Sequence, residues 1–397
     1  MLRRAVLTAP RFQRRHISTV FAPGDLALLR PTKSDRNNSY ASPILTKPLS
    51  PTGRVETHKG IINHSAILGK QVRDVVRTNI STSRDGRGKG SGAGGQEYRL
   101  HEVKLEEYVR LTRRLVTPLY PQDAGLIVGL LDLHLEPRRW GEEGDRLEIL
   151  EAGTGHGALT LYLSRAVHGA NVPMPRSRHD DAAQEDSHVA LEQWKASRRA
   201  VIHSIEISEK YSSHARTIVD GFRHGMYTHN VDFHVGSVSD ITSSLLAQRN
   251  GKEFLSHAFL DLPGTEGHLG IVAKALKVDG ALVVFCPSIT QVMACLETVK
   301  TDGIPLEMEK VLELGVNGGT GGREWDVRAV KPRARQHATN VVEDSDGEAR
   351  EDSGIDLSEE DGQGGRKDEG WKMICRPKVG ELVVGGGFLG VFRKKRL

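Results

Sequence analysis

The stretch LEILEAGTGHGALTLYL at positions 147–163 decides the fold class of this 397-residue chain. A short apolar run is followed by an acidic residue, three alternating glycines and a segment with apolar residues at helical spacing. Glycine tolerates positive φ, so Gly153, Gly155 and Gly157 let the chain reverse tightly and leave the backbone open to a ligand. A strand, a glycine-rich turn and a helix in this order predict a nucleotide-cofactor loop in an α/β protein. A glycine-rich corner without a ligand is the alternative.

The residue that ends the apolar run, Glu151, indicates the class of cofactor. The spacing GTGHGA also fits the dinucleotide pattern G-x-G-x-x-A. A carboxylate beside the turn would repel a pyrophosphate, whereas it suits S-adenosylmethionine, which carries an ammonium and a sulfonium group. We therefore expect S-adenosylmethionine at this loop.

Apolar runs separated by helical segments continue after the loop. The sequence predicts strands at 147–150, 201–205, 231–235, 258–260, 281–286, 309–314 and 382–391. Mostly apolar strands that alternate with helices predict a doubly wound, Rossmann-like α/β sheet that closes with a late hairpin, in a domain spanning residues 101–397. Before it, short apolar runs broken by Pro and Gly predict a small antiparallel β domain over residues 21–100.

Three segments interrupt these two units. Residues 84–95, RDGRGKGSGAGG, are expected to form a flexible loop in the β domain. Residues 171–200 have the composition of a surface insertion, and residues 333–370 that of an acidic, disordered one. The run 343–361 carries a net charge of −9 in a chain of net charge +4, which leaves +13 for the rest. Such a basic surplus suits RNA and is also common in matrix proteins.

The first 20 residues have the composition of a mitochondrial transit peptide. They contain five arginines, several apolar residues and no acidic residue. The run Arg15-His16-Ile17-Ser18 resembles a matrix-peptidase site that would be cut ahead of Ser18. The expected location is therefore the mitochondrial matrix, with the nucleus as the alternative, and an unstructured basic arm is the alternative reading of the segment.

Cysteine usage and hydropathy exclude other classes. The three cysteines form no C-x-x-C pair and no group with histidines, so neither a disulfide framework nor a metal site is expected. No apolar run is long enough to span a bilayer, so no membrane partner is expected.

Two more carboxylates follow predicted strands, at the edge where α/β sheets bind ligands. Glu206 ends VIHSIE, where a carboxylate can accept both ribose hydroxyls of a cofactor; an exposed helix cap is the alternative. Asp261 precedes Leu-Pro-Gly and is expected to face the transferred methyl group. Adenine N1 can attack a sulfonium methyl in line, and a carboxylate bonded to the exocyclic amine would stabilise the cationic product ring. A turn-capping role for Asp261 is the alternative.

Several motifs together resemble the catalytic subunits of the tRNA adenine N1-methyltransferases, which modify the T-loop adenosine. TPLYPQD at 117–123, EAGTGHG at 151–157, FLDLPG at 259–264 and VFCPSITQV at 284–292 are similar to successive motifs of that family. The earlier runs GDLALLR and GIINHSAILG resemble its small β domain, which helps to hold tRNA.

The resemblance implies methyl transfer from S-adenosylmethionine to N1 of a tRNA adenosine, with Asp261 as the catalytic carboxylate. It also implies a set of residues that bind the cofactor. These residues are Glu151, Gly153, Thr154, Gly155, His156, Gly157 and Glu206. Family members are tetramers, of one chain or of two related chains, and we expect the late hairpin, with Val383 and Val384, to form the contact.

The target adenine is stacked in a folded loop and must be extruded to react. We predict a pocket for it between Tyr120 and Asp261. His64 and Lys70 in the β domain are weaker candidates for RNA contact, since lone residues of these types are more often ordinary surface groups.

Several positions depart from the family's pattern, and these departures predict weak or altered cofactor affinity. They are Pro118 for a Gln, Ser237 for an Asp, His156 for a small residue, Gly264, Thr290 for an acidic residue, and Gly386 with Gly387 near a usual Gly-His-Thr. A non-catalytic RNA-binding scaffold subunit is one alternative function, and the retained glycines and carboxylates disfavour it. An adenine N1-methyltransferase of mitochondrial ribosomal RNA is the other.

Overall fold

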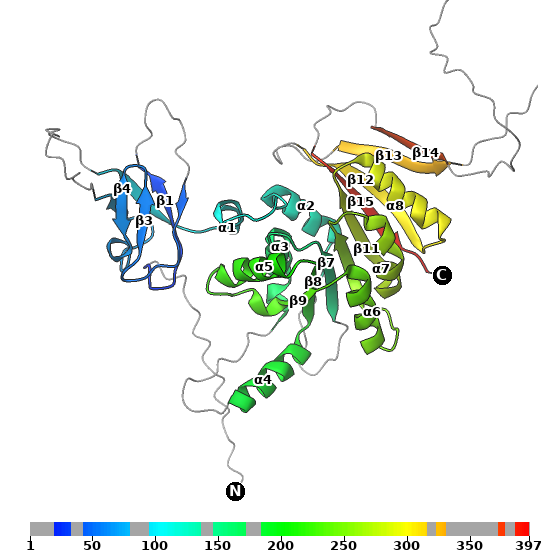
Figure 1. Cartoon of the computed structure of the whole chain (residues 1–397), viewed down its shortest axis with the longest axis horizontal. Coiled ribbons are helices and arrows are strands. Elements are labelled where there is room, and N and C mark those ends of the chain that lie inside the picture. Colours follow the sequence, from blue (N-terminus) through cyan, green and yellow to red (C-terminus); the bar gives the residue numbers. More distant parts are fainter. Residues whose placement is uncertain are drawn as a thin grey trace, which may run out of the picture.

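The computed structural model describes residues 20–32, 43–79, 95–135, 146–171, 184–315, 323–330, 372–377 and 386–396. Within them, a β module precedes a large α/β domain (Figure 1). The predicted transit peptide, apart from Val20, lies outside the described residues, as do residues 84–94 and the acidic segment 333–370.

The β module consists of a four-stranded antiparallel sheet, in the order β2-β1-β6-β5, and a separate hairpin. The sheet strands are β1 (Ala27–Pro31), β2 (Ile44–Leu45), β5 (Val75–Arg77) and β6 (Glu97–Glu102), and the hairpin is β3 (Arg54–Thr57) with β4 (Gly60–Asn63). Alternate residues of β6 point inward, and Tyr98 and Leu100 are fully buried with Leu29 and Ile62 in a core of the module's own.

The α/β domain is built on a nine-stranded sheet in the order β14-β13-β12-β15-β11-β10-β7-β8-β9. Its strands are β7 (Leu147–Ala152), β8 (Ala200–Glu206), β9 (Val231–Val235), β10 (Leu255–Leu260), β11 (Leu276–Cys286), β12 (Leu306–Glu313), β13 (Arg323–Val330), β14 (Lys372–Pro377) and β15 (Phe388–Lys394). The five strands from β11 to β9 are parallel to one another, and β15 is antiparallel to both of its neighbours.

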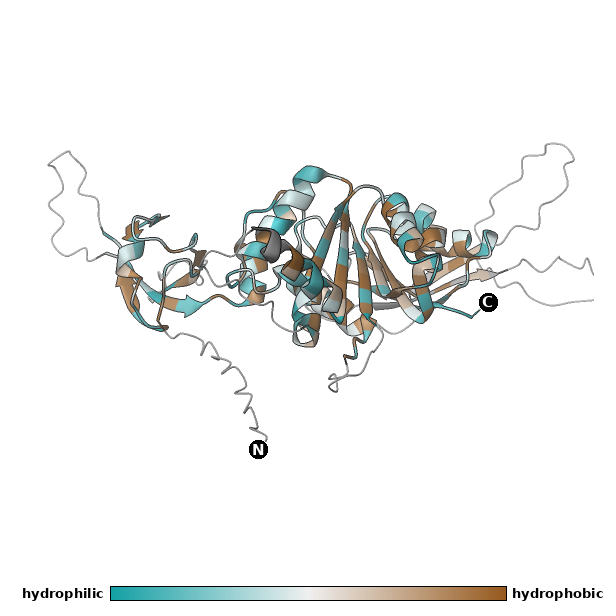
Figure 2. Ribbon diagram, turned by 90° about the horizontal axis from the view of Figure 1, so that it is seen from below, coloured by the Kyte–Doolittle hydropathy of each residue, from teal (hydrophilic) through white to brown (hydrophobic). Residues whose placement is uncertain are grey.

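Helices cover both faces of this sheet (Figure 1). The described helices are α1 (Leu105–Leu111), α2 (Pro121–Leu131), α3 (Ala158–Val167), α4 (Gln184–Ser197), α5 (Glu209–Gly221), α6 (Val238–Gln248), α7 (Leu269–Ala275) and α8 (Ile289–Thr301). One core contains buried residues of α1, α2, α3 and α5, and a second contains residues of α6, α7 and α8. Hydrophobic side chains therefore line the interior while the outward helix faces are polar (Figure 2).

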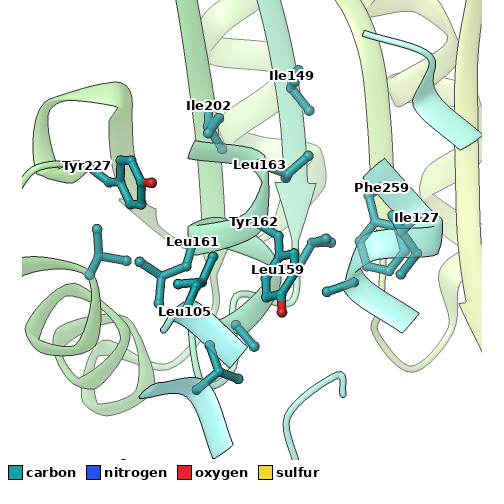
Figure 3. Close-up of a cluster of buried hydrophobic side chains, with 14 of the residues drawn as sticks. Leu105, Ile127, Ile149, Leu159, Leu161, Tyr162, Leu163, Ile202, Tyr227 and Phe259 are labelled. Carbon is teal, nitrogen blue, oxygen red and sulfur yellow. The ribbon is translucent and has the colours of Figure 1, made fainter. Parts of the chain in front are cut away.

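Neighbouring residues of the central strands separate into these two cores. Ile149 and Phe259 belong to the first core, whereas Leu150 and Leu260 belong to the second. Strand side chains alternate between faces, so a strand buried on both sides is a continuous apolar run. Figure 3 shows the first core, where Leu163 of α3 lies near Ile149 and Ile202 of the strands and Leu161 lies beside Leu105 of α1.

The predicted fold class is confirmed: the domain is α/β with a doubly wound parallel part. The strands predicted from the sequence do not include β13 and β14. Residues 382–385 of the expected late hairpin lie outside the described residues, and β15 is paired on both sides by β11 and β12. An open edge on β15, the basis for expecting an oligomer contact there, is therefore absent from its described residues.

The region expected to be a surface insertion, residues 171–200, contains the helix α4 in its described part. Trp194 of α4 is buried, and its ring lies beside His229 and the guanidinium of Arg198. None of the described helices has the length and apolar character that crossing a membrane requires.

Candidate functional site

The candidate site lies at the carboxyl ends of β7, β8 and β10. The chain leaves β7 toward β8 on one side and reaches β10 on the other, so the connections diverge at this point of the sheet. Backbone bonds tie the three strand ends together. The Gly153 amide donates to Ile205 O at 2.9 Å, and the Asp261 amide donates to Ala152 O at 2.9 Å.

The glycine loop has the conformation that the sequence predicts. Gly153, Gly155 and Gly157 have φ values of 85°, 53° and 82°. A Cβ on Gly153 would lie 1.9 Å from the carbonyl oxygen of Asp261, and one on Gly157 would lie 3.3 Å from the Cα of Ala215 in α5. The first position thus excludes any side chain, and the loop offers bare backbone at the strand ends.

Glu206 reaches across to this loop. Its Oε2 accepts from the Gly155 amide at 3.0 Å, and its Oε1 accepts from the Ser208 amide at 3.2 Å. A carboxylate has further acceptor sites after two such bonds, so Glu206 is able to accept ribose hydroxyls as well.

The carboxyl group of Asp261 is close enough to that of Glu206 to be affected by its negative charge. Burial, and after it the charge of Glu206, raises the pKa of the Asp261 carboxyl to about 6. Its side chain is half-buried and makes no hydrogen bond to another side chain in the described part of the protein. The following turn is held by a bond from the Thr265 hydroxyl to Leu262 O at 2.6 Å. Asp261 therefore has a fixed backbone and a carboxylate available to a ligand.

Glu151 differs from the expectation that its charge faces the ligand. Its side chain is 1% exposed, and its Oε2 accepts from Thr160 Oγ1 at 2.7 Å and from Ser204 Oγ at 3.0 Å. Burial raises the pKa of this carboxyl to about 7. Glu151 thus links β7 to the first turn of α3 and to β8, and a direct contact with a cofactor remains a prediction.

The two non-glycine residues of the loop are also turned inward. Thr154 Oγ1 lies 2.7 Å from Ser204 Oγ. His156 is 2% exposed, and its Nε2 lies 3.2 Å from Thr112 Oγ1 at the end of α1. Burial lowers the pKa of His156 to about 4, so the ring is neutral at pH 7. The contact between His156 and Thr112 was not predicted, because these residues are 44 positions apart.

The three candidate RNA-contact residues have different environments. Tyr120 precedes α2 and is 43% exposed, and Lys70 is exposed on the β module. His64 is 2% exposed and its Nδ1 accepts from the Ser50 amide at 3.1 Å. The ring of His64 is therefore buried inside the module, which disfavours an RNA contact in this conformation, and that contact remains a prediction.

Several residues at departures from the family pattern have structural roles. Ser237 caps α6, since its Oγ accepts from the Asp240 amide at 3.1 Å and donates to Asp240 Oδ2 at 2.9 Å. Pro118 is buried. Gly386 is needed at its position, because a Cβ there would lie 2.6 Å from Leu314 O.

The arrangement fits S-adenosylmethionine. The glycines leave room that a Cβ would fill, and Glu206 offers acceptors for ribose hydroxyls. Two carboxyl groups, those of Glu206 and Asp261, favour a ligand with net positive charge. No group of metal-ligating side chains is present among the described residues.

Comparisons with known proteins point in the same direction. No protein-family model matches the sequence. The sequence is 30% identical over 281 residues to the tRNA (adenine(58)-N(1))-methyltransferase TrmI of Thermus thermophilus, which covers 70% of this chain and 82% of the relative. It is 26% identical over 210 residues to the tRNA (adenine(57)-N(1)/adenine(58)-N(1))-methyltransferase TrmI of Methanocaldococcus jannaschii, which covers 53% of this chain and 66% of that protein.

Among solved structures, a SAM-dependent O-methyltransferase from Thermotoga maritima aligns with a TM-score of 0.55 at 17% identity, over 96% of this chain and 97% of that one. At this identity the similarity shows the fold alone.

Proposed function

Since the chain belongs to the TrmI-type tRNA (adenine-N1)-methyltransferases, we propose that it transfers the methyl group of S-adenosylmethionine to N1 of the T-loop adenosine of a tRNA. The relative that carries this assignment is matched over 82% of its length. Three of the motifs that resemble the family, EAGTGHG, FLDLPG and VFCPSITQV, lie at the carboxyl ends of the parallel strands β7, β10 and β11, where α/β sheets bind their ligands.

The residues proposed to hold the cofactor are the glycine loop and Glu206. Backbone of Gly153 to Gly157 would pack against the cofactor, and Glu206 would accept its ribose hydroxyls while keeping its bond to Gly155. Glu151 would support the site indirectly: its carboxylate accepts a hydrogen bond from Thr160 and so holds the start of α3 in place. When bound, the cofactor supplies an electrophilic methyl group on a sulfonium.

Asp261 is the proposed catalytic carboxylate. As adenine N1 bonded to the methyl carbon, the bond from that carbon to the sulfonium sulfur would break, a neutral thioether would leave, and the positive charge would pass to the adenine ring. The ionised Asp261 would accept a hydrogen bond from the exocyclic amine and stabilise this charge. With a pKa of about 6, the carboxyl is mostly ionised at pH 7 and can also take up a proton near neutrality.

The observation that carries this assignment is the contact between Asp261 and Gly153. The carbonyl oxygen of Asp261 occupies the space of a missing Cβ on Gly153, and the Asp261 amide is bonded to β7. The position of Asp261 is therefore fixed relative to the loop that would bind the methyl donor. In single-turnover assays on unmodified tRNA, Asp261→Asn is expected to lower the methylation rate at least about 100-fold.

The matched control for this variant is Asp302→Asn, a change at the exposed end of α8. It is expected to leave the rate unchanged. Equal rates for Asp261→Asn and the wild type would exclude Asp261 as the catalytic group.

We also propose that the protein acts in the mitochondrial matrix. The arginine-rich, acid-free composition of residues 1–20 supports this. A reporter fused behind residues 1–20 should enter mitochondria, and replacement of the five arginines by Gln should abolish import. Accumulation in the nucleus instead would favour the alternative location.

The active species is proposed to be a tetramer, of this chain alone or with a related non-catalytic chain. Light scattering of the purified chain would distinguish these: a mass near four chains supports the first form. A smaller mass together with absent activity supports the need for a second chain, and a fully active monomer would contradict both.

A further inference from the structure

The last turn of α1 and the segment that follows it carry three exposed arginines: Arg110 in the helix, and Arg113 and Arg114 beyond it. We propose that residues 110–120, here called the arginine strap, bind the sugar-phosphate backbone of the RNA substrate. The proposal rests on the proposed function, because it assigns a surface to the RNA partner of that reaction.

The arginine strap is fastened to the glycine loop at two points. First, Thr112 Oγ1 lies 3.2 Å from His156 Nε2. Because the single hydroxyl hydrogen of Thr112 is donated to Tyr108 O at 2.9 Å, Thr112 accepts the bond from His156. Further along, Val116 Cγ2 lies 3.3 Å from the position that a Cβ on Gly155 would take. The strap therefore packs against the loop proposed to bind the cofactor, which places its three arginines within a few residues of these two contacts.

The arginines of the strap have no carboxylate partner within the part of the chain that the structure describes. None of the three forms a salt bridge with any described residue, and the guanidinium of Arg114 donates to the carbonyl oxygen of Arg110 at 3.1 Å. By contrast, the buried Arg198 is held by Asp232 at 2.8 Å. The strap backbone is nonetheless fixed, since the carbonyl of Arg113 accepts from His214 Nε2 at 3.0 Å. Three unpaired positive charges on an immobile backbone are suited to an anionic partner.

The chemistry of the partner follows from the charge. The cofactor carries an ammonium, a sulfonium and one carboxylate, so its net charge is positive and a cluster of three guanidinium groups suits a polyanion better. Guanidinium groups bind phosphate oxygens with two parallel hydrogen bonds, and such contacts position a nucleic acid without reading its sequence. The strap ends at Tyr120, whose ring is 43% exposed and available to stack on an extruded base. One short segment thus offers cations for the backbone and an aromatic ring for the base.

The test compares two double variants of the full chain that lose the same charge. Arg113→Gln with Arg114→Gln removes two cations of the strap. The control, Lys252→Gln with Lys300→Gln, removes two exposed cations that follow α6 or end α8, at the opposite end of the sheet from the site. Affinity for unmodified tRNA is measured by anisotropy at several KCl concentrations, and affinity for S-adenosylmethionine by calorimetry.

The strap variant is expected to raise the tRNA Kd about tenfold at 0.1 M KCl and to reduce the slope of log K against log salt by about 1.4 to 1.8, because each lost phosphate contact removes about 0.7 to 0.9. Its affinity for S-adenosylmethionine should stay within about twofold of the wild type. If it falls further, the loop has shifted, and the single variants Arg110→Gln and Arg113→Gln, each expected to weaken tRNA binding about threefold, replace the double variant.

A strap variant with the Kd and salt slope of the control would overturn the proposal, and so would a wild-type chain that binds no tRNA. Failure of the proposed function has a different signature. In that case the wild type binds tRNA in a strap-dependent manner but transfers no methyl group to it.

Discussion

Gly153 and Asp261 are in backbone contact, so closely that a Cβ on the glycine would lie 1.9 Å from the carbonyl oxygen of the aspartate. The contact joins the loop after β7 to the turn after β10 and fixes a carboxyl group beside a bare stretch of backbone. It explains why a residue with a side chain does not fit at the position of Gly153.

Gly153→Ala is expected to disrupt this site. The new methyl group would clash with Asp261, and alanine at a φ of 85° is strained by about 1 to 2 kcal/mol before any clash is counted. Such an energy corresponds to about tenfold in affinity, so binding of S-adenosylmethionine should weaken at least that much in calorimetry.

The matched control for Gly153→Ala is Gly129→Ala. Gly129 lies in α2 with open space at its Cβ position, so alanine should stabilise the protein by about 0.5 to 1 kcal/mol and leave cofactor binding intact. Equal cofactor affinity in the two variants would refute the role assigned to the Gly153 contact.

The rate of methyl transfer should depend on pH through Asp261. The raised pKa of about 6 means that the carboxyl is ionised above this pH and protonated below it. Since only the ionised form can accept from the exocyclic amine, the single-turnover rate should fall about tenfold per pH unit below 6 and level off above about 7. Both substrates are kept well below saturation throughout, so that the profile reports the pKa of the free protein.

Glu206→Gln tests the cause of this pH dependence. The charge of Glu206 contributes to the raised pKa of Asp261, so its removal should move the midpoint of the same subsaturating profile to lower pH. A rate that is constant between pH 5 and 8 in the wild type would count against ionised Asp261 as the reacting group.

Glu151→Gln should make the protein relatively more stable at alkaline pH. The amide oxygen can still accept from Thr160 and Ser204, and no charge is left at this buried position. Because burial raises the folded-state pKa to about 7, the wild type loses stability as pH rises from about 4.5 toward 7. In urea unfolding, the free energy of unfolding of the variant relative to the wild type should be higher at pH 8 than at pH 5. An unchanged difference between the two would contradict a buried, raised-pKa carboxyl.

His156→Ser should loosen the contact between the glycine loop and the arginine strap. The change removes the bond to Thr112 and leaves space beside His214, and it is expected to lower the free energy of unfolding by about 1 to 3 kcal/mol. The control His134→Ser, at a side chain that is 82% exposed, should stay within about 0.5 kcal/mol of the wild type. Similar decreases in the free energy of unfolding for the two variants would contradict a stabilising contact between His156 and Thr112.

The sequence was most informative where local pattern and tertiary structure agree. Strands buried on both faces are continuous apolar runs, and the loop with Gly153, Gly155 and Gly157 carries its conformation in its residue types. Both features were therefore predictable, and with them the ends of the strands at which Glu206 and Asp261 are found.

The sequence was least informative where a residue's role depends on distant partners. His64 reads as a surface residue but is buried against Gly53 and bonded to Ser50. Glu151 reads as a ligand-facing charge but is enclosed by Thr160 and Ser204. Such contacts depend on how separate elements pack, which no local pattern encodes.

The missed strands have a related cause. β13 and β14 pair with each other from Trp325 to Val330, yet about forty residues, including the acidic run, separate them in sequence. A hairpin with so long a connection lacks the short turn that signals pairing.

The most direct test of the account is methyl transfer by the purified chain, from labelled S-adenosylmethionine to an unmodified tRNA transcript, with the modified position mapped by primer extension and nucleoside mass spectrometry. The expected product is 1-methyladenosine at the T-loop adenosine, and no product is expected when that adenosine is replaced by guanosine. Label on another base or at another atom of adenine, or none while cofactor and tRNA are both bound, would contradict it.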